Sequence, residues 1–277
     1  MSILSISQTL TWGTQFLNQK KITSSRLDAH ILLAFVLKKD RSYFITHGEE
    51  KISSTSYTSF QKLIQKRGTL YPVAYLTGHK EFYDLDFVVN ESVLIPRPET
   101  ELVIDLVLNR AKKPKTVLDI ATGSGAIALT LAKHLPKSKV VGSDISDKAL
   151  VVAKKNKRKL NIKNCSFVKS NLLLGIKEKP DILTANLPYL EGKDLKEKSI
   201  KYEPKLALFG GKDGTMLYEK LFKQIQKKKW NNFTLFLEIG TTQAKQITKL
   251  AEDILRVTSI QTHKDLAKED RVIEITL

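Results

Sequence analysis

The fold is decided by the stretch Val117-Leu118-Asp119-Ile120-Ala121-Thr122-Gly123-Ser124-Gly125. Its first four residues form a mostly apolar run that predicts a short buried strand, and the residues that follow predict a helix over 126–135. Glycines between the two let the backbone turn tightly and approach a ligand closely. A strand, a glycine loop and a helix in this order begin the alternation of an α/β fold.

The same alternation continues toward the end of the chain. Short apolar runs predict further strands at residues 140–143, 166–169, 182–185, 233–239, 257–261 and 271–277. Helical patterns fall between them at 147–160, 216–227 and 243–254. Because parallel strands need crossover connections that cover the sheet, we expect a mostly parallel sheet of seven strands with helices on both faces.

The residues before this region follow other patterns. Apolar residues near helical spacing, among them Leu10, Leu17 and Phe60, predict a helical bundle over 1–72. We expect this bundle to be a substrate-recognition domain, with a lid as the alternative. Strand-like alternation predicts a β-hairpin connector over 73–98, with prolines on both sides of Arg97. The α/β domain is then expected to span the remaining residues, 99–277.

Composition excludes several classes of protein. The net charge is +17, but the lysines are spread along the chain, which favours a generally basic surface and leaves contact with RNA or the ribosome open. The single cysteine, Cys165, excludes an intrachain disulfide, and the five histidines form no ligand pattern, so we expect no metal. Without a membrane-length apolar run or a signal-like start, we expect a cytoplasmic protein with no membrane partner.

A nucleoside site is predicted at the ends of the first two strands. Asp144 ends the second strand, where its carboxylate can accept hydrogen bonds from both ribose hydroxyls. The glycine loop lacks the Gly-Lys-Ser/Thr of a P-loop, and Ala121 replaces the first glycine of the dinucleotide fingerprint. S-adenosylmethionine is therefore favoured, with a dehydrogenase or a cofactor-free turn as alternatives. The expected cofactor-binding loop residues are Ala121, Thr122, Gly123, Ser124 and Gly125, and the alanine should be tolerated if its φ is negative.

A second site is predicted directly after the fourth strand, at Asn186, Leu187, Pro188 and Tyr189. Pro188 cannot continue the strand, and it holds Leu187 in an extended conformation. The side-chain oxygen of Asn186 and the carbonyl of Leu187 then offer two acceptors to a planar NH2 group. A proline-terminated turn capped by Asn186 is the purely structural alternative.

Three further features are expected near this site. Arg97 and Glu99 either border it or pair across the domain joint. Residues 210–214 are expected to form a glycine-rich turn at its rim. Glu238, at the end of a strand on the ligand-binding edge, is expected either to have a structural role or to support the residues of the site.

Longer motifs extend the pattern over almost the whole chain. They lie at residues 72–78, 81–82, 94–101, 202–204, 207–208, 210–214 and 237–240. Together with residues 186–189 they resemble the signatures of the peptide chain release factor glutamine methyltransferases, the PrmC/HemK family. Leu187 departs from that family's usual Asn-Pro-Pro-Tyr, and Ala121 departs from a glycine. The tetrapeptide as spelled here also occurs in ribosomal RNA adenine dimethylases.

The resemblance implies a Rossmann-like domain that transfers a methyl group from S-adenosylmethionine, with S-adenosylhomocysteine as product. The substrate would be the glutamine of the Gly-Gly-Gln tip of class-1 release factors, methylated on its side-chain nitrogen. Asn186 and Leu187 would hold this amide, beside the cofactor, and Tyr189 would pack on it. Asn171 and Leu172 would lie near the adenine, with a plain turn as the alternative for Asn171. A monomer is expected.

Two rival functions stay open. The first is an N6-adenine methyltransferase acting on DNA or RNA. The NH2 group of adenine would fit the same two acceptors, and the flipped base could stack on Tyr189. The helical first 72 residues and the motifs at 72–101 argue against it. The other rival is a non-catalytic, cofactor-binding protein associated with the ribosome, and the intact Asn186 and Tyr189 argue against that.

Overall fold

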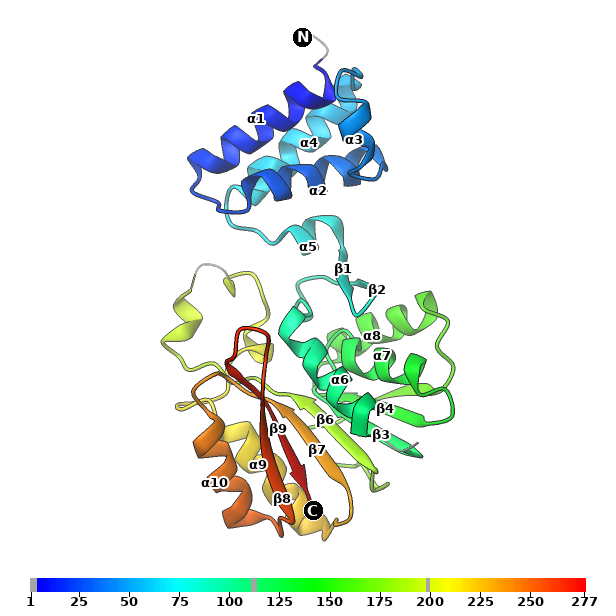
Figure 1. The fold of residues 1–277 in the computed structure, drawn as a ribbon, viewed down its shortest axis with the longest axis vertical. Helices are drawn as coiled ribbons and strands as arrows, with labels where there is room; N and C mark the ends of the chain where they lie inside the picture. Colours follow the sequence, from blue (N-terminus) through cyan, green and yellow to red (C-terminus); the bar gives the residue numbers. More distant parts are fainter. Residues whose placement is uncertain (1–3, 111–113, 198–199) are drawn as a thin grey trace. The chain divides into compact units, whose positions relative to one another are not determined.

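Two compact units make up the chain, Met1–Gly78 and His79–Leu277, and each has a hydrophobic core of its own (Figure 1). The computed structural model describes residues 4–110, 114–197 and 200–277. Within these ranges, no helix combines the length and the apolar character that crossing a membrane requires.

The first unit is a bundle of helices around one apolar core. Its helices are α1 (Ile6–Gln19), α2 (Ser25–Leu37), α3 (Tyr43–Thr46), α4 (Ser54–Arg67) and α5 (Val73–Thr77). Ser5 begins α1 with a capping box, because its side chain accepts from the Gln8 N–H while the Gln8 side chain accepts from the Ser5 N–H. Leu17, Leu32 and Phe60 are fully buried between the helices. The helical character predicted for this part is therefore confirmed.

The connector between bundle and sheet differs in part from the prediction. Residues 73–77 form α5, where strand-like alternation was expected, and only β1 (His79–Phe82) and β2 (Leu85–Val88) form the antiparallel hairpin. Pro72 stands immediately before α5, and Gly78 ends it with a φ of +76°. A fixed φ before a helix and a left-handed glycine after it favour a short helix here, which alternation alone does not reveal.

The second unit is built on the predicted seven-stranded sheet, whose order is β5-β4-β3-β6-β7-β9-β8. Neighbouring pairs from β5 to β7 are parallel, and β9 runs antiparallel to both of its neighbours. The mostly parallel sheet is therefore confirmed. Its strands are β3 (Thr116–Ile120), β4 (Lys139–Asp144), β5 (Cys165–Lys169), β6 (Ile182–Asn186), β7 (Thr234–Glu238), β8 (Ser259–Lys264) and β9 (Asp270–Thr276).

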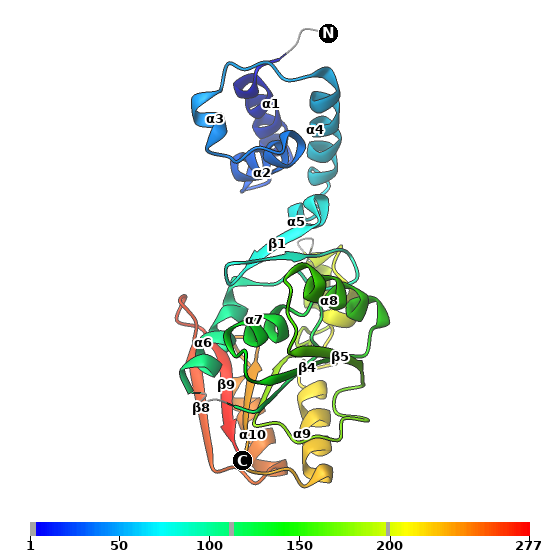
Figure 2. The ribbon, with the colours of Figure 1, turned by 90° about the vertical axis from the view of Figure 1, so that its right-hand side faces the viewer.

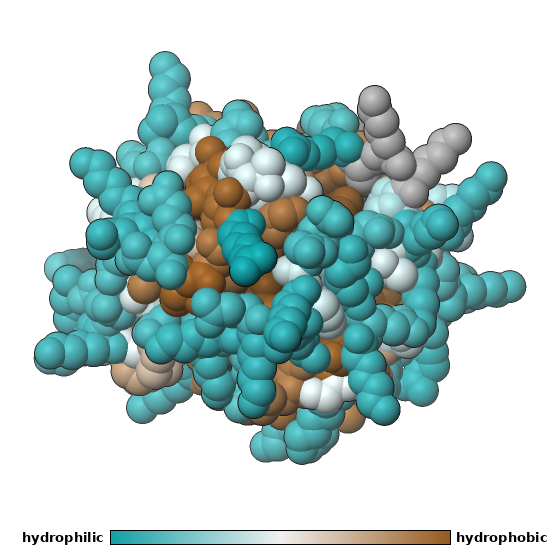
Figure 3. Space-filling model, turned by 90° about the horizontal axis from the view of Figure 1, so that it is seen from below, coloured by the Kyte–Doolittle hydropathy of each residue, from teal (hydrophilic) through white to brown (hydrophobic). Residues whose placement is uncertain are grey.

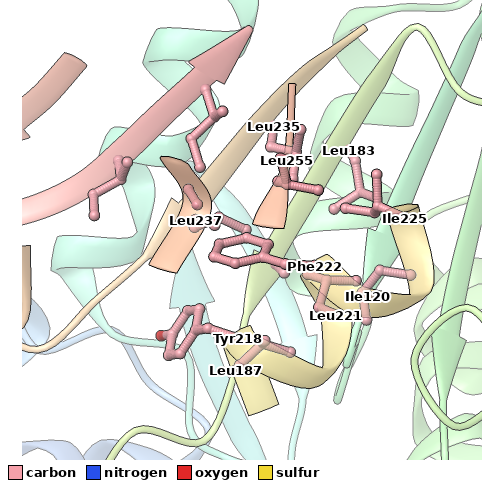
Figure 4. Packing of buried hydrophobic residues seen from close by; sticks show 14 of the residues in the cluster. Ile120, Leu183, Leu187, Tyr218, Leu221, Phe222, Ile225, Leu235, Leu237 and Leu255 are labelled. Atoms are coloured by element: carbon pink, nitrogen blue, oxygen red, sulfur yellow. The ribbon is translucent and has the colours of Figure 1, made fainter. Parts of the chain in front are cut away.

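Helices cover both faces of this sheet. They are α6 (Glu101–Arg110), α7 (Ala126–His134), α8 (Asp147–Lys159), α9 (Met216–Lys228) and α10 (Ala244–Ile254), with 3-10 turns η1 (Pro98–Thr100), η2 (Asp194–Lys196) and η4 (Lys205–Ala207). The core on the side of α9 and α10 contains Leu183 and Phe222, and the core on the side of α6 and α7 contains Val103 and Phe236. Figures 1 and 2 show the two helix layers, and Figure 4 shows the first core at close range.

The parallel order brings the carboxyl ends of five strands to one edge of the sheet. Loops that follow these strands therefore meet at that edge, which is where open α/β sheets bind ligands. The strands end at Ile120, Asp144, Lys169, Asn186 and Glu238.

The face of the molecule seen in Figure 3 is largely hydrophilic. Hydrophilic side chains project from most of the face seen in Figure 3, and apolar patches lie exposed between them.

Candidate active site

A cavity of about 200 Å³ lies at the carboxyl edge of the parallel strands. Most of the residues predicted to form the site line it: Ala121, Thr122, Gly123, Ser124, Asp144, Asn171, Leu172, Asn186, Leu187 and Pro188. The described lining includes neither Gly125 nor Tyr189. The glycine loop and the turn after β6, which are about 60 residues apart in the sequence, therefore share one cavity.

Two residues in the wall of this cavity have strained backbone conformations. Ala121 has a φ of +56°, so the condition of a negative φ, under which the alanine should be tolerated, is not met, and Leu172 also has a φ of +56°. A side chain in the left-handed region costs about 1–2 kcal/mol, because Cβ approaches the following carbonyl oxygen. Strained residues of this kind cluster at functional sites, where the surrounding structure holds them in place.

Gly125 acts in packing rather than in the cavity wall. It has a φ of +81° at the start of α7, and a Cβ there would lie 3.1 Å from Leu129 Cδ1 and from Phe167 Cζ. A larger residue would push α7 away from β5. The predicted contact between Gly125 and a cofactor stays a prediction.

Asp144 faces the cavity from the end of β4. Its Oδ2 accepts a hydrogen bond from the Gly123 N–H at 2.9 Å, and its Oδ1 accepts from the Ser146 N–H at 2.9 Å. Burial raises the pKa of this carboxyl, while these backbone donors act to lower it. Each carboxylate oxygen can accept more than one hydrogen bond, so both can still receive a ligand hydroxyl.

Asp119, which the sequence did not single out, ties the glycine loop to the neighbouring strand. Its Oδ2 accepts from the Thr122 hydroxyl at 2.6 Å, and its Oδ1 accepts from the Thr184 hydroxyl at 2.8 Å. The side chain is 1% exposed, and burial raises its pKa to about 7. An acidic residue inside an otherwise apolar strand is the signal that could have revealed it.

The loop after β5 forms the next part of the wall. The Ser170 hydroxyl donates to the Leu172 carbonyl at 2.7 Å, which supports the left-handed turn at Leu172. Asn171 accepts a hydrogen bond at Oδ1 from Lys220 Nζ at 3.2 Å. Asn171 therefore has a turn-stabilising partner and also lines the cavity.

The turn after β6 lines the cavity with Asn186, Leu187 and Pro188, and the Leu187 side chain lies in the core. Asn186 Nδ2 donates to Thr100 Oγ1 at 3.3 Å. The side chain of Leu187 is 1% exposed and packs beside Tyr218 and Phe222 in the core shown in Figure 4. Leucine at this position is therefore explained by packing.

Tyr189 lies behind the turn. Burial raises the pKa of its hydroxyl to about 12. Its carbonyl accepts a hydrogen bond from Gln243 Nε2 at 3.1 Å, and its Cδ2 would lie 3.4 Å from a Cβ at Gly240. A role for Tyr189 against a substrate amide stays a prediction.

The glycine-rich segment at 210–214 packs directly on this turn. A Cβ at Gly210 would lie 2.5 Å from the Pro188 carbonyl oxygen and 2.7 Å from Tyr189 Cα. Gly211 and Gly214 have φ values of +102° and +72°. The segment requires glycines because its backbone touches the backbone of the predicted acceptor site.

Arg97 also lines the cavity, and its partner belongs to the same unit. Its guanidinium forms an ion pair with Glu203, whose other oxygen accepts from the Ile95 N–H at 3.1 Å. The Glu203 side chain is almost completely buried. The pair links residues 94–99 to the loop before η4, whose Leu206 and Ala207 form part of the cavity wall.

Glu238 lies beside Asn186 and is 1% exposed. Burial raises its pKa to about 7, against hydrogen bonds from Thr100 and Asn186 that act to lower it. Its Oε2 is buried without a hydrogen-bond partner among the described residues.

In the described part of the chain, no group of three or more His, Cys, Asp or Glu side chains is arranged to hold a metal ion.

Two family models match the chain. A model described as PrmC N-terminal domain matches residues 8–78, and one described as methyltransferase domain matches residues 111–253. The second match alone covers more than half of the chain.

Curated relatives match over a longer range. A release factor glutamine methyltransferase of Clostridium acetobutylicum is 37% identical over 258 residues, and the match covers 89% of each chain. A bifunctional methyltransferase of Rickettsia bellii is 32% identical, and the match covers 99% of this chain. The chain spans about half the length of that relative, 55%.

Among solved structures, a methyltransferase from Pyrococcus furiosus has a TM-score of 0.54 and is 17% identical in sequence. The match covers 78% of this chain and 96% of that chain. At this level of identity the likeness concerns the fold alone, and it agrees with the Rossmann-like sheet described above.

Proposed function

The chain belongs to the release factor glutamine methyltransferase family, and we propose that it methylates a glutamine side-chain nitrogen in class-1 peptide chain release factors. The glutamine is that of the Gly-Gly-Gln motif, as the sequence resemblance implies. Curated relatives named for this activity are 32–37% identical to the chain, which supports a protein substrate over a nucleic acid.

The methyl donor that we propose is S-adenosylmethionine, which supplies an activated methyl group on a sulfonium and leaves as S-adenosylhomocysteine. The residues of the cavity suit the parts of this molecule. The Asp144 carboxylate is an acceptor for ribose hydroxyls, and Gly123 has no Cβ to block a close approach to the backbone. Asn171 and Leu172 border the position proposed for the adenine.

The observation that carries the proposal is that Asn186 and Leu187 line the same cavity as Gly123 and Asp144. An amide nitrogen is a weak nucleophile because its lone pair is delocalised into the carbonyl. Asn186 Oδ1 and the Leu187 carbonyl would accept its two hydrogens and aim the nitrogen at the methyl group. Both oxygens would also stabilise the positive charge that develops on the nitrogen.

The direct test is mass spectrometry of a release-factor digest after incubation with the protein and S-adenosylmethionine. We expect a mass increase of one methyl group on the peptide that contains Gly-Gly-Gln, located on the glutamine. A release factor with that glutamine replaced by alanine is the matched control. Radiolabel that enters DNA or ribosomal RNA, and no release factor, would favour the N6-adenine alternative.

The first unit is proposed to recognise the release factor, and the protein is proposed to act as a cytoplasmic monomer. The match of residues 8–78 to the PrmC N-terminal domain supports the first statement. Hydrogen exchange in the full chain, with and without a release factor, tests it. Slower exchange in α1, α2 or α4 is expected, and protection confined to 79–277 would contradict the proposal.

A further inference from the structure

A row of polar side chains runs along one face of the sheet beneath the cavity. Asn186 ends β6 and Glu238 ends β7, and the two residues are partners in the parallel register. Partners in adjacent parallel strands point to the same face of a sheet, so these side chains lie next to each other. Thr100 from η1 covers them and is 4% exposed.

The hydrogen bonds of this group determine which way the amide of Asn186 points. Nδ2 donates to Thr100 Oγ1 at 3.3 Å, and the side chains of Thr100 and Asn186 both act to lower the pKa of the neighbouring Glu238 carboxyl. An ionised carboxylate can only accept hydrogen bonds. The NH2 end of Asn186 must therefore point toward Glu238 and Thr100, which leaves Oδ1 for the cavity.

We propose that Glu238 is a positioning residue, whose buried carboxylate keeps Asn186 Oδ1, rather than Nδ2, turned toward the nitrogen to be methylated. The inference deepens the proposed function and rests on it, because only an acceptor at this position can hold an NH2 group. The carboxylate also polarises the Asn186 amide and makes Oδ1 a stronger acceptor.

The charge state of Glu238 controls this orientation. A protonated carboxyl gains an O–H donor, which can donate a hydrogen bond to Asn186 Oδ1. The amide can then reverse and place Nδ2 in the cavity. Burial raises the pKa of Glu238 to about 7, so the change falls within an accessible pH range. Arg271 of β9 favours the ionised form, while Glu99 of η1 and the buried Tyr189 lie near enough to interact with it. Tyr218 of α9 donates to the Glu238 carbonyl at 2.6 Å.

The first test observes the orientation without any methyl transfer. Side-chain NH2 resonances of the 15N-labelled full chain are recorded between pH 5.5 and 8.5, with Asn186 assigned from the Asn186→Asp variant. We expect the Asn186 resonances to shift with a midpoint near pH 7 in the wild type and to stay constant in Glu238→Gln. Resonances that do not respond to pH in the wild type would overturn the inference, whatever the substrate is.

The second test measures turnover. Glu238→Gln should lower kcat by about 10- to 100-fold, less than loss of a direct contact, and leave the KM for S-adenosylmethionine within about twofold. The decline of kcat below pH 7 should disappear in this variant. A purely structural role would leave the shape of the pH profile unchanged, and that result would contradict the proposal.

Two variants serve as controls. Glu274→Gln changes another buried carboxyl of the same sheet, one that pairs with Arg110 and His263, and it should keep the acidic decline of kcat. If Glu238→Gln does not fold, Thr100→Val removes the bridging hydroxyl at nearly constant volume, and Thr100→Ser should restore activity. A wild-type protein that shows the NMR transition but does not methylate release factors would refute the proposed substrate and leave the orientation intact.

Discussion

Two buried carboxyls lie on the same face of the sheet, one under the glycine loop and one under the turn after β6. Asp119 has both oxygens occupied by threonine hydroxyls, at 2.6 and 2.8 Å. Glu238 has one buried oxygen without a partner in the described structure. Burial raises the pKa of both groups to about 7.

The difference suggests that the two halves of the site are stabilised in different ways. A satisfied carboxyl holds its neighbours in one arrangement, so the half that surrounds Asp119 is ready for a cofactor before one binds. A buried acceptor without a partner costs about 1–3 kcal/mol, so the half that surrounds Glu238 stores an unfavourable interaction next to Asn186. Strain of this kind is tolerated where it serves a function.

The largest effect is expected from Asn186→Ala, which removes the central acceptor from the half of the site that surrounds Glu238. We expect kcat to fall by about 10²–10³-fold, because charge stabilisation at the reacting nitrogen is lost. Calorimetry should show little change in the affinity for S-adenosylmethionine. Near-normal turnover in the variant would remove Asn186 from the mechanism.

The matching change in the half of the site that surrounds Asp119 is Asp144→Ala. Loss of two charge-assisted hydrogen bonds to the ribose should weaken cofactor binding by about 2–4 kcal/mol, measured by calorimetry. At saturating cofactor, kcat should recover more completely than in Asn186→Ala. An unchanged dissociation constant would exclude the ribose contact.

Stability as a function of pH compares the two carboxyls directly. Because the folded protein raises each pKa from an ordinary 3.8 or 4.5 to about 7, the folded state binds these protons more tightly than the unfolded chain. The free energy of unfolding should therefore decrease as the pH rises from about 4 to about 7, by roughly 3 kcal/mol for each group.

Variants in which the amide replaces the carboxyl should remove this pH dependence of the free energy of unfolding to different degrees. In chemical denaturation at pH 8, Glu238→Gln should be more stable than the wild type by up to about 3 kcal/mol, with no difference near pH 4. Asp119→Asn should gain less, because Thr122 and Thr184 lose a carboxylate acceptor. Equal gains in the two variants would contradict the proposed difference between the halves.

The smallest effect is expected from Thr184→Val, which removes one of the two donors to Asp119. Unfolding should become easier by about 1 kcal/mol, and by more at pH 8 than at pH 5, since the ionised carboxyl depends more on the donor. Thr130→Val is the matched control, because the Thr130 hydroxyl is buried without a partner among the described residues. That variant should be at least as stable as the wild type.

Much of this architecture follows from local features of the sequence. Apolar runs and the glycine loop predicted seven strands and the mostly parallel sheet, and the positions of Asp144 and Asn186 at strand ends predicted a shared edge. Parallel strands bring their carboxyl ends together whatever their order, so periodicity and strand position were enough for these expectations.

Other features depended on which strands become neighbours. The adjacency of β6 and β7 brings Glu238 beside Asn186, and the adjacency of β3 and β6 brings Thr184 onto Asp119. The positive φ of Ala121 and the position of Tyr189 behind the turn also come from packing around the loops. A sequence pattern reports what each residue prefers locally, whereas the partners and pKa of a buried group are decided only when distant segments close around it.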